Sequence, residues 1–163
     1  MSKFRISVEI DPKSRKLLHR VISLLPGKVI DPSVESGIKA GAKLIQKRAQ
    51  MNIEKKLNKH PTGKLRDSIA IEIEKSGRDT KATIGTDVIY SRIHEKGGII
   101  RPVKAKMLAW QGEDGKMIFA KQVRIPARPY LEPATKQSPG EVLGTIGQII
   151  RDHISESIRR IIR

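Results

Sequence analysis

The residue pair best placed for chemistry in this chain is His94 beside Glu95, in the run "IHEKGG". A histidine and a carboxylate can act together as general acid and base. Adjacent residues of these types more often form a surface turn or a structural hydrogen bond. The four histidines show no metal-ligand spacing, and the chain has no cysteine. We therefore expect no enzyme activity, no metal site and no cofactor.

Other catalytic patterns are missing from the sequence. It holds no HExxH, GxSxG, Walker or GxGxxG motif, and so lacks the spacings that place a nucleophile, a metal or a phosphate. Glu72 and Glu74 alternate along a strand-like run, which is typical of the solvent face of a strand. The sequence therefore predicts no catalytic residue.

The chain is strongly basic, with 33 Lys and Arg against 17 Asp and Glu and a net charge of +16. Such an excess favours polyanions or acidic protein surfaces as partners. The charge is dispersed, however, so diffuse solubilising charge explains it equally well. No zinc-finger, RRM or KH signature occurs, and five aromatic residues (two Phe, two Tyr and one Trp) are too few for a base-stacking platform.

Basic residues also gather on a predicted hairpin, the arm, at about residues 99–124. It contains a single large aromatic residue, Trp110, and its turn spans Gly112 to Gly115. The arm is either a solvated hairpin whose Trp110 caps the core, or an extension that meets another subunit or an anionic surface. A long hairpin is poorly stabilised alone, which favours the extension. The residues that could face an anion are Arg101, Lys104, Lys106, Lys116, Lys121 and Arg124.

The first elements that must position these residues are a strand and two helices. "KFRISVEI" alternates like a strand, and the run from Asp11 to Gly27 predicts a helix. A longer helix is predicted over about 33–58, starting at Asp31 and Pro32. Its first half is slim because it is rich in glycine and alanine, which indicates either close packing against another backbone or a tolerated weak spot.

The second half of the chain predicts strands and a last helix. "KLRDSIAIEIEK" and "TKATIGT" are predicted antiparallel partners around the turn "SGRD", and "DVIYSRIHEKGG" a short helical turn. A C-terminal helix carries a stripe of isoleucines from Ile146 to Ile161. We predict an α+β fold, in which a long helix and a C-terminal helix pack on an antiparallel sheet with a protruding hairpin. Residues 1–30 form an N-terminal extension, and residues 31–163 form the main domain.

Three short runs occur in the order "TGKLRDSI" (62–69), "YSRIHEKGG" (90–98) and "IPARPYLEPA" (125–134). Gly97 and Gly98 allow a positive φ or a close backbone approach, and a β-branched residue at Gly98 should harm folding or assembly. Pro126 and Pro129 fix φ in the third run. In one alternative, that run presents Arg128 and Tyr130 to another subunit. In the other, Tyr130 fills the edge of the core and Arg128 forms an internal salt bridge.

Together these runs resemble the phage virion morphogenesis family, the tail-completion or neck proteins of Mu-like tailed phages. The resemblance extends over about residues 33–163. It implies a structural role for the residues of the three runs, in motif packing or at a subunit interface. They are Gly63, Leu65, Ser68, Tyr90, His94, Glu95, Gly97, Gly98, Pro126, Arg128, Pro129 and Tyr130.

The resemblance implies a structural virion protein that assembles in the host cytoplasm. It would form a homo-oligomeric ring, by family symmetry a hexamer, at the head–tail junction or tail end. Its partners would be its own copies, neighbouring connector and tail proteins and, in the lumen, DNA. The alternative from charge alone is a non-specific nucleic-acid-binding protein. No apolar run approaches the ~20 residues of a membrane helix, and the N-terminal run lacks a signal-peptide core, so we expect an unexported protein without a membrane partner.

Overall fold

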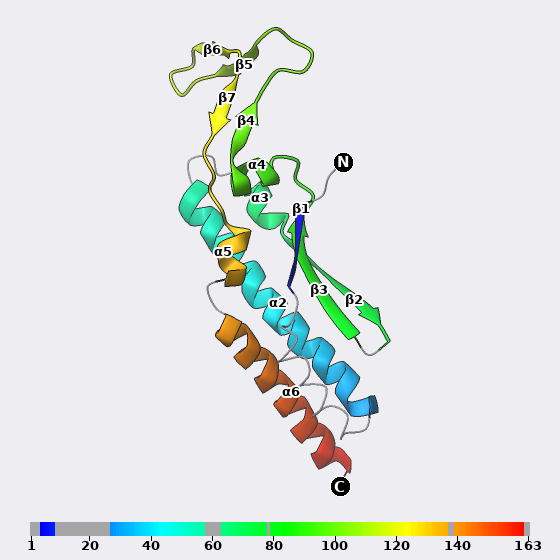
Figure 1. Ribbon diagram of the computed structural model, residues 1–163. Coiled ribbons are helices and arrows are strands. Elements are labelled where there is room, and N and C mark those ends of the chain that lie inside the picture. The colour runs from blue at the N-terminus through cyan, green and yellow to red at the C-terminus, as the bar shows by residue number, and fades with distance from the viewer. Residues whose placement is uncertain (1–3, 9–26, 58–62, 78, 137–138, 162–163) are drawn as a thin grey trace.

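The structure is a computed structural model that describes residues 4–8, 27–57, 63–77, 79–136 and 139–161. Its longest elements are two helices, α2 (Gly27–Leu57) and α6 (Pro139–Ile161), which run antiparallel along each other (Figure 1). This confirms the predicted α+β fold with a long helix and a C-terminal helix. The helix predicted between Asp11 and Gly27 lies outside the described residues.

The main sheet has the strand order β1–β3–β2 and is antiparallel throughout. Its strands are β1 (Phe4–Val8), β2 (Ala70–Ser76) and β3 (Asp79–Thr86). Ile71 lies opposite Ile84, and Ile73 lies opposite Ala82. Because facing residues of an antiparallel pair share one side of the sheet, this register puts the isoleucines of β2 on the core side and Glu72 and Glu74 outside, as the alternation predicted.

The sheet does not continue into the second half of the chain. β4 (Gly98–Ile100) pairs with β7 (Val123–Ile125), and β5 (Leu108–Gln111) pairs with β6 (Met117–Ala120), each as a separate two-stranded sheet. The predicted hairpin with its turn between Gly112 and Gly115 is thus present. Figure 1 shows it projecting from one end of the molecule, beyond the short helices α3 (Lys64–Asp67) and α4 (Ser91–Lys96).

The core lies around α2, which packs on the sheet, on α6 and on α5 (Leu131–Lys136). Ile45, Ala49 and Ile53 of α2 are buried together with Ile84 of β3. Val142, Ile146 and Ile150 of α6 complete this cluster at the helical spacing that the sequence predicted.

The slim half of α2 is the surface on which α6 packs. A Cβ atom added at Gly37 would lie 3.1 Å from the carbonyl oxygen of Ile146, and one added at Gly41 would lie 2.9 Å from the Ile146 side chain. The close-packing explanation of these glycines is therefore correct. Arg48 of α2 also forms an ion pair with Glu141 of α6.

Two predicted boundaries were wrong. α2 begins at Gly27, ahead of the predicted start, so Pro32 lies inside it. A proline past the first turn costs one helical hydrogen bond and crowds the carbonyl four residues earlier, and the rest of the helix continues on both sides of it. "KLRD" forms the helix α3 rather than the start of a strand, and β2 begins at Ala70. Hydrogen bonds from α2 to the carbonyls of Arg66 and Ile69 override the strand pattern there.

Candidate functional site

In the run "TGKLRDSI", the described residues from Gly63 to Ile69 include a single helical turn that docks on α2. Gly63 precedes α3 with φ 64°, which is a left-handed conformation that favours glycine. Leu65 is buried in the core. The Ser68 hydroxyl donates to the Leu65 carbonyl at 2.8 Å and shares a 2.6 Å hydrogen bond with Thr86 of β3. This run therefore joins the helix α2 to the start of the sheet.

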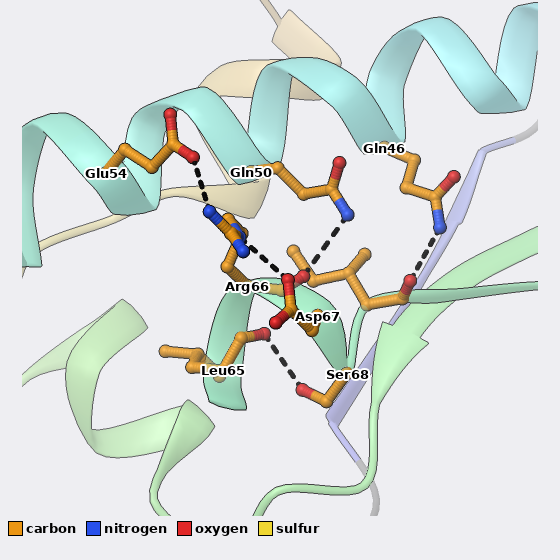
Figure 2. A network of polar contacts seen from close by, with 8 residues as sticks. Gln46, Gln50, Glu54, Leu65, Arg66, Asp67 and Ser68 are labelled. Atoms are coloured by element: carbon orange, nitrogen blue, oxygen red, sulfur yellow. Dashed lines mark hydrogen bonds and ion pairs between the residues drawn. The ribbon is translucent and has the colours of Figure 1, made fainter. Parts of the chain in front are cut away.

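A row of polar side chains on α2 holds this turn in place (Figure 2). Gln46 donates to the carbonyl of Ile69 at 2.6 Å, and Gln50 donates to the carbonyl of Arg66 at 3.3 Å. Glu54, the third member of the row, forms an ion pair with Arg66 at 2.9 Å. Arg66 also bonds Asp67, and this hydrogen bond lowers the pKa of the Asp67 carboxyl.

The second and third runs meet at the side chain of Glu95. One carboxylate oxygen, Oε2, accepts hydrogen bonds from the backbone N–H groups of Tyr130 and Leu131, at 2.8 and 3.0 Å. The other, Oε1, accepts from the backbone N–H of Glu132 at 2.8 Å. These N–H groups lie at the N-terminus of α5, where a helix leaves donors unpaired and favours negative charge. Glu95 is 3% exposed, so it is a buried cap of α5.

The two backbones also touch directly at Gly97. The backbone N–H of Arg128 donates to the carbonyl of His94 at 2.7 Å. Gly97 has φ 69° and ψ 179°, and a Cβ atom there would lie 2.8 Å from the backbone nitrogen of Ala127. Gly98 is different: its φ is not positive and an added Cβ would make only ordinary contact with Ile93. The expectation that Gly98 needs a positive φ was wrong, because Gly97 alone makes the turn.

Tyr130 is fully buried, and its ring belongs to the core. Burial raises the pKa of its hydroxyl. The hydroxyl lies near Ser91, but it forms no hydrogen bond of normal geometry with any described residue. On the α2 side, Asn52 donates to the Tyr130 carbonyl at 3.0 Å and Lys56 donates to the Pro129 carbonyl at 2.6 Å. The third run is thus held between α4 and α2.

We call the contact of α4 with residues 125–132 the junction, and Arg128 and His94 lie at its surface. Arg128 is exposed and forms no ion pair with the described residues, so the expected internal salt bridge is not present. His94 is half-buried, with its ring edge-on to Tyr90 at 5.7 Å between centroids. Burial, and then the nearby charge of Arg128, lower the pKa of the His94 imidazole.

The arm carries most of the exposed large hydrophobic side chains that the structure describes. Among the described residues, thirteen large hydrophobic side chains are exposed, and eight of them lie between residues 99 and 119. Trp110 is 38% exposed and is not among the described residues that pack against the core cluster, so the alternative in which it caps the core is wrong. The eight are Ile99, Ile100, Val103, Met107, Trp110, Met117, Ile118 and Phe119.

A groove of about 500 Å³ lies on the outer face of β2 and β3. Its rim carries Ile89 and Tyr90, which are 80% and 40% exposed. Its charged lining residues, in the part of the chain that the structure describes, are Glu72, Asp87 and Lys64. We call it the β2–β3 groove, and it is completed by Ser68, Ala70, Thr83, Gly85, Thr86 and Val88.

The three runs that the sequence singled out therefore form one continuous structure around α2. A family model, the phage virion morphogenesis family, matches residues 39–154. The chain belongs to this family. No curated protein and no solved structure matches it. It is accordingly a structural protein of the phage virion.

The matched region of this virion morphogenesis protein includes the junction, the arm and the β2–β3 groove, and most of α2 and α6. The family is one of structural and assembly proteins and is not known for catalysis. In agreement, both carboxylate oxygens of Glu95 are engaged by backbone N–H groups rather than by His94. No helix in the described ranges is long and apolar enough to cross a membrane.

The sequence did not predict some contact residues of this virion morphogenesis protein. Gln46, Gln50 and Glu54 recur at intervals of four, and this polar row was the available signal for a contact on α2. Asn52 and Ile89 gave no comparable signal. The six cations predicted to face an anion lie on or beside the hairpin, and all six are exposed: Arg101, Lys104, Lys106, Lys116, Lys121 and Arg124.

Proposed function

We propose that this protein is a tail-completion or neck protein that forms a ring at the head–tail junction or tail end. Its ring contacts would repeat from one copy to the next and close, as heterologous contacts do. Six copies are expected from the symmetry of phage tails. The ring would assemble in the host cytoplasm, contact neighbouring connector and tail proteins, and remain in the virion.

The observation that carries this proposal is the exposed apolar surface of the arm. Monomeric proteins rarely leave large hydrophobic side chains grouped in water, and such groups mark interaction sites. A two-stranded hairpin is also marginally stable alone. Val103 is 95% exposed and Phe119 is 60% exposed, so the arm gains stability if another surface covers it.

Electron microscopy of purified particles tests the proposal. A density ring at the head–tail junction or tail end, labelled by an antibody against this protein, is the expected result. Its deletion mutant should accumulate heads and tails that fail to join, or tails that lack their end. Particles that contain no copy of the protein, or normal joining without it, would contradict the proposal.

A second function has support from one feature of α2. Lys39, Lys43 and Lys47 are exposed and recur every four residues, so they form a row of positive charge on one helix face. Such a row could contact the phosphates of DNA passing through the ring. This contact would be non-specific, since it would read backbone charge and not bases.

A salt titration of duplex DNA binding tests the lysine row. Neutralising all three lysines with glutamine should reduce the slope of log affinity against log salt by about two to three. A matched control neutralises Lys104, Lys106 and Lys121 of the arm, which removes the same charge elsewhere. Equal effects of the two variants would indicate diffuse attraction, and no binding at low salt would remove this function.

A further inference from the structure

Among the residues that the structure describes, the chain exposes two separate groups of large hydrophobic side chains. One is the arm, with eight of the thirteen exposed large hydrophobic residues. The other is the rim of the β2–β3 groove, where Ile89 and Tyr90 stand next to each other. Ten of the thirteen therefore belong to these two surfaces. Grouped exposed apolar residues indicate surfaces that are covered in the assembled state.

The charges of the two surfaces are opposite. The arm carries six cations against Glu113 and Asp114, a balance of +4. Counted over the lining residues that the structure describes, the β2–β3 groove carries Glu72 and Asp87 against Lys64, a balance of −1. Complementary charge steers two surfaces together and suppresses wrong pairings.

We propose that the arm of one copy of this chain docks in the β2–β3 groove of the next copy. This inference rests on the proposed function, because it names the contact that would repeat around the ring. The groove, at about 500 Å³, admits several large side chains. Phe119 and its neighbours on the hairpin supply them, and Ile89 and Tyr90 cover them from the rim.

A second copy fits these observations better than the same chain. Figure 1 shows the hairpin of β5 and β6 at the far end of the ribbon formed by β4 and β7, pointing away from the main sheet. The ribbon is anchored at its base by Gly97 against Ala127, which holds it in that direction. Because the arm and the groove are different surfaces, the contact is head-to-tail, and its repetition gives a ring or a filament.

Disulfide trapping tests the contact cleanly, because the natural chain has no cysteine. Ile89→Cys marks the groove, and Val103→Cys, Met117→Cys and Phe119→Cys mark the arm in separate full-length variants. Each arm variant is mixed with Ile89→Cys and oxidised gently. A disulfide requires Cα atoms within about 7 Å, so only surfaces that meet will be linked efficiently.

We expect at least one arm variant to link to Ile89→Cys about fivefold more than to the control Met51→Cys, which is 44% exposed on α2. Mass spectrometry of the linked peptides identifies the pair. Yields no higher than with Met51→Cys for all three arm positions would overturn the proposal. Predominant arm-to-arm links within single variants would also overturn it, since they indicate a two-fold contact.

The result of the disulfide test can be told apart from the result of the electron microscopy test of the ring. Rings seen on particles without arm-to-groove links would leave the proposed function standing and remove this contact. Links without rings on particles would do the opposite. Phe119→Ser is then added to the arm variant, Val103→Cys or Met117→Cys, that links better to Ile89→Cys. The yield of that disulfide should fall about tenfold, as expected for loss of a central aromatic anchor. An unchanged yield would contradict the aromatic's place in the groove.

Discussion

Glu95 and Tyr130 are 35 positions apart in the sequence, and the carboxylate of Glu95 lies 2.8 Å from the backbone nitrogen of Tyr130. The same carboxylate also bonds the next two backbone N–H groups of α5. A buried carboxylate is stabilised only when such donors surround it. One side chain on α4 therefore determines where the segment after the arm re-enters the core.

Replacing Glu95 should weaken folding strongly. Glu95→Ala leaves the N–H groups of Tyr130, Leu131 and Glu132 without their acceptor, and should lower the free energy of unfolding by about 2–4 kcal/mol. Glu95→Gln keeps one acceptor oxygen and should lose roughly half as much. Urea unfolding of the purified protein measures both. Glu113→Ala, in the exposed hairpin turn, is the control and should change stability little; an equally mild Glu95→Ala would contradict the capping role.

The two glycines that follow α4 should differ sharply. Gly97→Ala is expected to cost about 2–4 kcal/mol, because its backbone conformation suits only glycine and a Cβ would lie 2.8 Å from the Ala127 nitrogen. Gly98→Ala should cost less than about 1 kcal/mol, since its Cβ would lie 3.4 Å from Ile93. Thermal unfolding of the two variants provides the comparison. Similar melting temperatures would show that the backbones do not cross at Gly97.

Glycines of the two long helices should respond in opposite directions. Gly144→Ala places a methyl group in open space on α6 and should stabilise the protein by up to about 1 kcal/mol through helix propensity. Gly41→Val forces a branched side chain against Ile146 and Val142 and should destabilise it by about 1–3 kcal/mol. Chemical unfolding measures both changes. Stabilisation by Gly41→Val would refute close packing of α2 on α6.

The stability of the fold should fall as the pH drops below the ordinary pKa of histidine. Burial and Arg128 lower the pKa of His94 in the folded state, so between the two pKa values the unfolded chain binds more protons. The contribution of His94 is complete above its unfolded pKa and is lost as the pH falls through its folded pKa. His94→Gln should flatten this part of the profile in unfolding experiments between about pH 7.5 and about pH 5, the range in which histidine titrates. A profile as steep as that of the natural protein would assign the effect to other groups.

Much of this fold could be predicted from local pattern. The isoleucine stripe of α6, the alternation of β2 and the turn from Gly112 to Gly115 each depend on residues close in the chain. The three runs that identify the family are likewise short contiguous motifs, which the sequence shows directly. Helix ends and α3 were less accessible, because Gln46 and Gln50 decide them from another element.

The sequence by itself determined the class of fold, the family and the residues worth testing. Only the tertiary structure decided what those residues do: Glu95 caps α5, Gly97 rather than Gly98 makes the close turn, and Tyr130 belongs to the core. The reason is physical. Periodicity and turn chemistry act within a few residues, whereas capping, backbone crossing and burial depend on partners that the chain brings together from positions some 30 residues away, such as Glu95 and Tyr130.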